Sequence, residues 1–390
     1  MTKQPNSGWS SLVAPPKGDL FGKSLASWRT SARETLGLPL KPIIAVGHQP
    51  EFFHPGVLAK FIAASQLAIQ IDGVLVYLVV DHHIGTSGVI EVPNEDEEYL
   101  TASILKIANI NPQVSMKDQA RVTPISDDVF SKALNNASGD NAAMQFANAT
   151  NLLMSPWATV DYCVSGTSLL ETEIGEAIVG VMRRNPEACI TAYNKAVKQF
   201  PHFGIATLDD HELPLWQGET NANVTTNFED LRPRALLLTL LARLAIGDLF
   251  VHGTGGSRYD NIMEQWLFDW LGVYPCNTTM TTATLKLPLE VQSITDARSG
   301  FFNPQNLSEK KKMYLDLIDR SPQGSTERQL QFHAIHTWLD SVGTRPDIKA
   351  IRNSEEIANR RDWAFPLYPT EMIDELVDEI TKDFVVAKLP

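Results

Sequence analysis

Histidines and glycines gather in three short segments of this 390-residue chain. The segments are Gly47-His48-Gln49-Pro50, Asp81-His82-His83 and His252-Gly253-Thr254-Gly255-Gly256. An imidazole near neutral pH can bind an anion, transfer a proton or coordinate a metal. Five of the nine histidines lie in or beside these segments, namely His48, His54, His82, His83 and His252. The three segments are therefore candidate parts of one site.

The glycines of the third segment could contribute through their backbone. Gly253, Gly255 and Gly256 lie between an expected strand and an expected helix. Such a loop leaves N–H groups free to face an anion at the start of the helix. Glycine also simply permits a tight turn, so the pattern alone is open to both interpretations. Arg258 follows the loop and could add a bidentate contact to a phosphate or carboxylate, or lie in solvent.

Four cations flank the three segments. Arg232 and Arg234 stand at an expected helix start, where a positive charge opposes the helix dipole. This placement indicates either a ligand or a buried carboxylate near them. Together with Lys60 and Arg258, they lead us to expect a locally positive cleft that suits an anionic ligand.

An apolar run precedes each segment and is expected to be a buried strand. Residues 41–47, 74–80 and 248–252 have this character, and helical patterns follow over 57–71 and 259–271. In an open parallel sheet, ligands bind at the carboxyl ends of the strands. We therefore expect the side chains of His48, Gln49, Asp81, His82 and His252 to face one cleft.

The fold class expected from these patterns is α/β, with a Rossmann-like parallel sheet core, an inserted helical region and a helical C-terminal part. The expected parts are an N-terminal arm (1–40, with a helix near 24–36), the first half of the core (41–126), the inserted helical region (127–230), the second half of the core (231–300) and the helical C-terminal region (301–390). Within them, we expect helices over 127–154, 158–200, 231–246, 307–319, 327–339 and 370–384, an extended segment over 99–110, and a loop over 201–230.

Composition narrows the class of partner. Hydrophobic residues make up 43% of the chain and charged residues 20%, as in a globular protein. The net charge of −13 disfavours nucleic acid and membrane lipid, so the expected partner is a small-molecule substrate. Residues 1–20 lack an apolar signal segment and the three cysteines form no C-x-x-C pair, so we expect a cytoplasmic protein. The sequence leaves the oligomeric state open.

Two regions of the chain, about 41–92 and 231–270, contain a series of motifs in a particular order. The motifs are Val46-Gly47-His48-Gln49, Phe53, Pro55-Gly56, Leu58, Lys60, Asp81-His82, Leu231-Arg232-Pro233, Gly255-Gly256 and Tyr259. In these motifs the chain resembles the cysteine-adding enzyme of bacillithiol synthesis, the BshC-like family. The departures are His48, where the family has glutamine, His83, and a shorter chain. The resemblance implies a Rossmann-like core, an adenine nucleotide such as ATP, and ligase-like chemistry that joins a carboxylate to an amine on a small polar metabolite.

That chemistry assigns roles to particular residues. His48, Gln49 and the backbone of Gly255-Gly256 are our candidates for binding the phosphates, because fixed donors stabilise the charge that develops there. Asp81 paired with His82 is our candidate for deprotonating the amine.

Other interpretations remain open. The start of the first segment, with Pro55-Gly56 and Lys60, also resembles WbqC-like proteins. Asp81-His82-His83 resembles the triplet of the DHH phosphoesterases, which would make the protein a metal-dependent hydrolase with a divalent metal held by histidines and Asp81. The preceding strand, however, ends without an aspartate. A third alternative is a non-catalytic protein that binds a small ligand in the same crevice.

Overall fold

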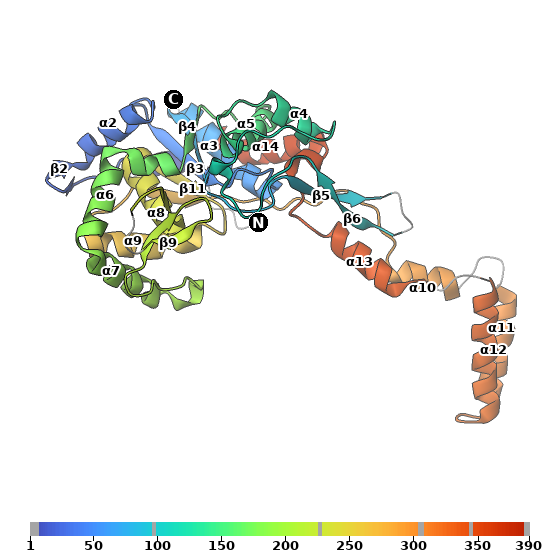
Figure 1. The fold of residues 1–390 in the computed structure, drawn as a ribbon. Helices are drawn as coiled ribbons and strands as arrows, with labels where there is room; N and C mark the ends of the chain where they lie inside the picture. The colour runs from blue at the N-terminus through green and yellow to red at the C-terminus, as the bar shows by residue number, and fades with distance from the viewer. Residues whose placement is uncertain (1–7, 96–98, 225–227, 303–307, 343–345, 386–390) are drawn as a thin grey trace. The chain divides into compact units, whose positions relative to one another are not determined.

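The computed structural model describes residues 8–95, 99–224, 228–302, 308–342 and 346–385 (Figure 1). The chain forms two compact units. The first unit comprises residues 1–90, 105–285 and 362–390, and the second comprises 91–104 and 286–361. All three histidine-containing segments belong to the first unit.

A five-stranded parallel sheet forms the centre of the first unit (Figure 1). Its strand order is β12-β11-β3-β4-β7. The strands are β3 (Ile43–His48), β4 (Val74–Val79), β7 (Tyr162–Ser165), β11 (Leu249–His252) and β12 (Asn277–Met280). The chain adds β4 and β7 on one side of β3 and then returns to add β11 and β12 on the other, so the strand order reverses between β3 and β11. This 3-2-1-4-5 arrangement is that of a Rossmann-like sheet, and the expected α/β class is confirmed.

Helices cover both faces of this sheet (Figure 1). Ala45 and Val76 pack into a core shared with α2, α6 and α8, whereas Tyr77, one position along β4, packs its ring on Phe61 of α3. Successive strand residues point to opposite faces, so every residue of β4 is buried. The helices of this unit are α1 (Trp9–Leu12), α2 (Leu25–Thr35), α3 (Pro55–Gln70), α4 (Val129–Asn136), α5 (Ala142–Met154), α6 (Glu173–Arg184), α7 (Pro186–Gln199), α8 (Ala235–Leu241), α9 (Ser257–Leu271) and α14 (Thr370–Val385).

Several expected elements differ from the structure. Residues 162–165, expected to be helical, form β7 at the edge of the sheet, and the expected loop over 201–230 contains two strands. A three-stranded antiparallel sheet joins β8 (Leu213–Gln217), β9 (Ala222–Val224) and β10 (Leu231–Pro233). The helix expected from residue 231 therefore begins only at Ala235, and its end winds as a π-helix over Ala242–Ile246.

The second unit is mainly helical. It holds α10 (Ile294–Phe302), α11 (Ser308–Arg320), α12 (Thr326–Val342) and α13 (Ile348–Ala358), and its small core includes Ile318 and Trp338. The remaining strands of the chain pair as β1 (Asp19–Leu20) with β2 (Lys23–Ser24), and β5 (Val89–Asn94) with β6 (Thr101–Lys106). Among the described residues, no helix combines the length and the apolar character needed to cross a membrane.

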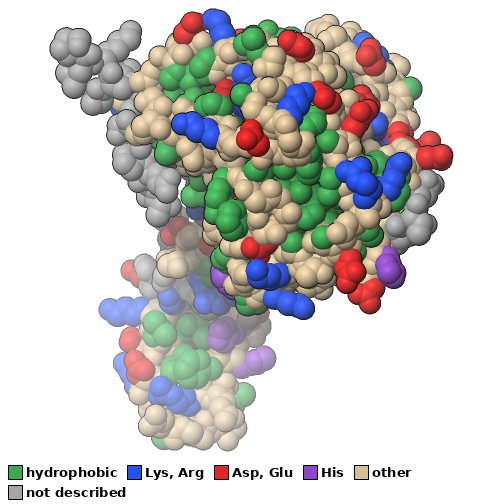
Figure 2. Space-filling model, turned by 90° about the vertical axis from the view of Figure 1, so that its left-hand side faces the viewer, with side chains coloured by type: hydrophobic (Ala, Val, Ile, Leu, Met, Phe, Trp, Pro, Cys, Tyr) green, Lys and Arg blue, Asp and Glu red, His purple; other side chains and the backbone are tan. Residues whose placement is uncertain are grey.

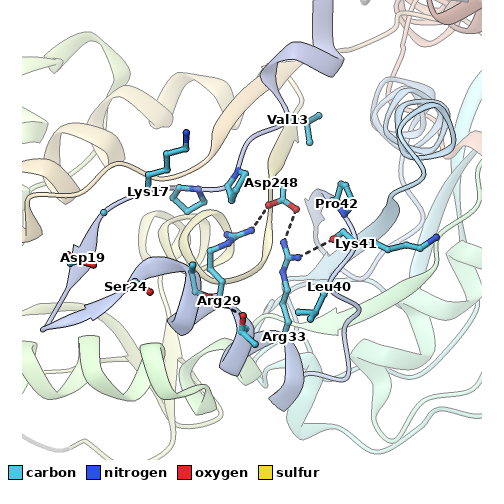
Figure 3. A pocket seen from close by; sticks show the side chains of 15 residues that line it. Val13, Lys17, Asp19, Ser24, Arg29, Arg33, Leu40, Lys41, Pro42 and Asp248 are labelled. Atoms are coloured by element: carbon cyan, nitrogen blue, oxygen red, sulfur yellow. Dashed lines mark hydrogen bonds and ion pairs between the residues drawn. The ribbon is translucent and has the colours of Figure 1, made fainter.

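A buried carboxylate fastens the amino end of the sheet. Asp248, just before β11, pairs with Arg29 at 2.6 Å and with Arg33 at 2.8 Å, both from α2 (Figure 3). The same carboxylate accepts the backbone N–H of Ile43 at 2.7 Å, at the start of β3. The guanidinium groups also donate to the carbonyl oxygens that end the π-helix, including that of Ile246. One side chain thus joins two neighbouring strands and a covering helix.

The surface of the first unit mixes charges of both signs. Figure 2 shows acidic and basic side chains interspersed over one face, with hydrophobic side chains between them. On this face, the acidic side chains are therefore interspersed with cations rather than gathered into one acidic field.

We expect Asp248→Asn to lower the free energy of unfolding by about 3–5 kcal/mol, because it leaves two buried guanidinium groups without their counter-charge. Denaturant titration measures this. The matched control is Asp72→Asn, since Asp72 is 89% exposed and pairs with Lys41 at the surface. That change should cost about 1 kcal/mol or less. Equal effects of the two substitutions would contradict the role given to Asp248.

Candidate functional site

A cavity of about 520 Å³ lies at the carboxyl ends of β3, β4 and β11. It stands at the point where the strand order reverses, which is where open α/β sheets bind ligands. All three histidine-containing segments contribute to it. Its polar lining includes Gly47, His48, Gln49, His54, Lys60, His82, His252, Gly253, Gly255 and Gly256. Its apolar lining includes Leu78, Val80, Leu236, Leu238, Phe250 and Met263.

His48, the last residue of β3, is held in place on two sides. Its Nδ1 lies 3.1 Å from the backbone oxygen of Gln49, and its ring packs edge-on against Phe53 with centroids 5.0 Å apart. Burial and the nearby Lys60 ammonium hold the pKa of His48 well below its usual value. The imidazole is therefore neutral at physiological pH, with one nitrogen that can donate and one that can accept.

Lys60 brings a buried amine to the cavity. Its side chain comes from α3 and is only 5% exposed. The Nζ atom donates to the backbone oxygen of Gly47 at 3.1 Å, and no carboxylate of the described chain lies within 4 Å of it. Burial lowers the pKa of Lys60 to about 8. The amine is thus partly neutral in mildly alkaline solution, which a surface lysine is not.

The two long helices that begin at the cavity differ at their N-termini. At the start of α3, His54 accepts the N–H of Gly56 at 3.0 Å, so this end is capped by its own side chain. At the start of α9, Gly256 supplies no side-chain cap. The N–H of Tyr259 donates to the backbone oxygen of Gly256 at 3.0 Å, within the first turn of α9. Because the positive end of the helix dipole lies beside the cavity, an anion is favoured at the start of α9.

His252, the last residue of β11, lies against that helix start. Its Nε2 is 3.1 Å from Oδ1 of Asp260, although the two groups are not aligned for a hydrogen bond. Asp260 in turn pairs with the buried Arg243 at 3.1 Å. A side chain at Gly256 would meet the imidazole, since a β-carbon there would lie 2.4 Å from its Nδ1. Glycine at position 256 is therefore what allows the imidazole to sit at the helix start.

Asp81 does not reach the cavity, which corrects the role expected for it. Its carboxylate accepts hydrogen bonds from Ser165 Oγ at 2.6 Å and from the N–H and hydroxyl of Thr167 at 3.0 and 2.9 Å. Burial alone would raise the pKa of Asp81, but these bonds and the adjacent His82 lower it. A carboxylate occupied in this way fastens β4 to β7 rather than contacting a ligand.

His82 does line the cavity. Its side chain is 5% exposed, and its Nδ1 lies 3.6 Å from Asp81 Oδ1 without a hydrogen-bond partner. His83 does not line the cavity. Its ring turns toward Gly85, where a β-carbon would lie 2.6 Å from Nε2, and burial lowers its pKa. In the described part of the chain, no three His, Cys, Asp or Glu side chains gather as a metal site.

The arginines expected to make the cleft positive are engaged elsewhere. Arg232 is fully buried and pairs with Asp118 at 2.7 Å and with Asp230 at 3.2 Å. Arg234 pairs with Glu212 at 2.6 Å and stacks on Trp216. These carboxylates offset the positive charges, so the expectation of a cleft lined by arginines was wrong for both. The side chain of Arg258 lies outside the described residues.

The cavity nevertheless lacks a free negative charge. Asp260 is the carboxylate in its lining, and that group is paired with Arg243. Lys60 supplies the positive charge that was expected from the arginines. The cavity therefore suits an anion although the chain as a whole carries −13.

Sequence reasoning missed two groups of lining residues. Asp260 lies one helical turn after Gly256, so the helical periodicity of 259–271 could have placed it beside the loop. Trp216 gave no such signal, because residues 201–230 were expected to be a loop. The leucines of α8 belong to an apolar run that indicates buried core rather than the lining of a cavity. The apolar side of the cavity was therefore not foreseen.

A larger hollow, of about 740 Å³, lies at the opposite end of the sheet (Figure 3). Arg29, Arg33 and Asp248 form part of its lining. Their charged groups already bind one another and the backbone, as the dashed contacts in Figure 3 show. The charges in this hollow therefore serve the fold, and the smaller cavity remains the candidate functional site.

No protein-family profile matches the chain, and no curated protein matches it. Nine chains of solved structures match it, and two of them are named here. One is tyrosyl-tRNA synthetase complexed with L-tyrosine from Archaeoglobus fulgidus, with 12% identity, a TM-score of 0.29, and 98% of each chain covered. The other is tryptophanyl-tRNA synthetase from Plasmodium falciparum, with 10% identity, a TM-score of 0.26, and 93% of this chain and 89% of that chain covered. TM-scores this low carry no functional argument, so the fold is described from its own sheet.

We expect Lys60→Met to stabilise the protein at pH 7. The fall in pKa from 10.5 to about 8 corresponds to about 3 kcal/mol of disfavoured charge in the folded state. Loss of the bond to Gly47 offsets about 1 kcal/mol of this gain. Between pH 8 and 10.5 the unfolded chain holds a proton that the folded chain has released, so the wild type gains stability as pH rises. The advantage of the variant should therefore shrink over that window in denaturant titrations, whereas the exposed Lys198→Met should show no such trend.

We expect Gly256→Ala to lower the free energy of unfolding by about 1–3 kcal/mol, because the new methyl group displaces the His252 ring. Gly255→Ala is the matched control, since a β-carbon at Gly255 would meet nothing within 4 Å. Thermal unfolding of both variants measures the difference. If Gly256→Ala proves as stable as Gly255→Ala, the close contact with His252 does not constrain the loop.

Proposed function

We propose that this protein is a ligase-like enzyme that uses an adenine nucleotide to activate a carboxylate for attack by an amine, in the cavity at the carboxyl ends of β3, β4 and β11. The observation that carries the proposal is the position of the cavity. It combines the reversal of strand order with the glycine-rich start of α9, and this combination suits the phosphates of a nucleotide.

The donors around the cavity fit an activation step. Transfer of a phosphoryl or nucleotidyl group to a carboxylate places negative charge on phosphate oxygens, and fixed donors supply the largest part of its stabilisation. The backbone of Gly255 and Gly256 would hold the phosphates from one side. Lys60 and His48 would face them from α3 and β3.

The second step needs a group that removes a proton from the attacking amine. His82 is our candidate, because its ring lines the cavity and its Nδ1 lies 3.6 Å from the Asp81 carboxylate, which can hold the ring in orientation. A positioned base of this kind contributes about 10²–10⁴-fold to the rate. Asp81 then acts as a positioning residue that holds the end of β4, and does not itself contact the substrate.

The apolar lining favours a substrate that is not wholly polar. Leu236 and Leu238 of α8 and Met263 of α9 would contact the part of the ligand that lies away from the phosphates. The sequence resemblance to the cysteine-adding enzyme of bacillithiol synthesis supports the same reaction class.

We expect calorimetric titration to show tighter binding of ATP than of ADP, and weak binding of adenosine, because the phosphates provide the charge that the α9 terminus and Lys60 attract. His48→Ala should weaken ATP binding about tenfold, as the loss of one hydrogen bond to a charged group does. The matched control is His202→Ala, which changes an exposed histidine outside the cavity.

Equal affinities for ATP and adenosine would contradict a phosphate site at α9. Turnover is measured separately, as pyrophosphate or phosphate release from ATP with mixtures of carboxylates and amines. Tight ATP binding without release under any mixture would favour the non-catalytic alternative over the ligase.

A further inference from the structure

Lys60 has surroundings that differ from those of an ion-pairing lysine. Its side chain is 5% exposed and reaches the cavity from within α3. Its stem passes Gly253, whose added β-carbon would lie 3.5 Å from Lys60 Cδ. The hydrogen bond to the Gly47 oxygen occupies one of its three donor positions, and no carboxylate of the described chain pairs with it. The amine is thus held in a fixed place and remains accessible to a ligand in the cavity.

A buried amine of this kind costs stability, so its presence needs a reason. Solvated lysines are protonated and do not act as nucleophiles, whereas desolvation and nearby cationic groups favour the neutral, nucleophilic form. Burial lowers the pKa of Lys60 to about 8, in agreement with this setting. Phosphate binding alone would be served equally well by a fully charged surface lysine.

We propose that Lys60 forms an imine with a small aldehyde or ketone that also carries an anionic group, bound in the cavity with its anion at the start of α9. This inference goes beyond the proposed ligase function and does not depend on nucleotide binding. The geometry that supports it is the fixed Lys60 amine, which shares the cavity with the glycine-rich start of α9 and with the imidazoles.

Side chains in the cavity can carry the protons that imine formation requires. Neutral Lys60 Nζ adds to the carbonyl carbon, and the electron pair of the C=O bond moves to oxygen, which takes up a proton. The resulting carbinolamine loses water as its hydroxyl accepts a second proton and the nitrogen gives up its own. His48 or His82 can carry these protons between nitrogen and oxygen, because a neutral imidazole both donates and accepts. No oxidant or reductant takes part.

The test uses pyridoxal 5′-phosphate as the probe, since it joins an aldehyde to a phosphate. The intact protein is mixed with the probe and treated with borohydride, which adds hydride to the imine carbon and fixes the product as a secondary amine. Mass spectrometry and peptide mapping then locate the label. We expect a single preferred label on Lys60, and its yield should rise as pH passes about 8. The titratable groups that line the cavity with it are His48, His54, His82, His252 and Asp260.

The labelling is compared between lysine variants and between two aldehyde probes. Lys60→Met, which should fold more stably than the wild type, must abolish the preferred label, whereas Lys41→Met at the surface must leave it unchanged. Pyridoxal, which lacks the phosphate, should label Lys60 more weakly than pyridoxal 5′-phosphate, and inorganic phosphate should compete with the latter. Label spread over exposed lysines, or unchanged in Lys60→Met, would overturn the proposal. Equal labelling by both aldehydes would overturn the anionic part of the ligand.

Discussion

The carboxylate of Asp248 is the interaction on which the arrangement of the sheet depends. It accepts the N–H of Ile43 where β3 begins and holds two arginines of α2. A buried carboxylate with two buried guanidinium partners is stable only while all three are present, since removal of one leaves a charge uncompensated. The contact therefore fixes β11 beside β3 at their amino ends. Their carboxyl ends, which bear His252 and His48, consequently open side by side.

The candidate site at the carboxyl end of the sheet differs from the amino end in how its polar groups are paired. At the amino end, the charges of Asp248, Arg29 and Arg33 are paired with one another. At the carboxyl end, the Lys60 amine donates to Gly47 and pairs with no carboxylate of the described chain, and the buried Nδ1 atom of His82 makes no hydrogen bond there. Donors left unsatisfied in a buried place lower stability, so such a cluster is typical of a site that meets its partner in a ligand.

The sequence predicted the central strands and their connection to the site because those signals are local. Residues 74–80 form a continuous apolar run, which is typical of a strand buried on both faces. The polar residues of the site segment come immediately after this run in the sequence. Strand β7 has only four residues, too few to show the alternation of buried and exposed side chains that marks a strand. Three of the four residues are also half-buried, which weakens that alternation further. Because β7 was missed, Ser165 and Thr167 could not be recognised as the partners that withdraw Asp81 from the cavity.

Partners that are distant in the sequence account for the other errors. Arg232 binds Asp118, 114 positions away, and the sequence left open whether a ligand or a buried carboxylate lies beside the arginine. By contrast, the α9 loop was identified because its glycines adjoin both the strand and the helix. A single sequence thus shows functional groups that lie near one another along the chain. It does not show which of these groups are neutralised by a carboxylate from a distant part of the chain.

The strand order also shapes how the chain can fold. β3 can pair with β4 soon after both strands are synthesised. Its other edge can pair only after β11 is synthesised, because Ile43 and Asp248 are 205 positions apart. Until that segment arrives, the central strand presents an unpaired, wholly apolar edge, the kind of edge that recruits other chains. Contacts this far apart in sequence also form slowly. During synthesis, the nascent sheet is therefore most vulnerable to aggregation at the same strand that later carries His48 into the cavity.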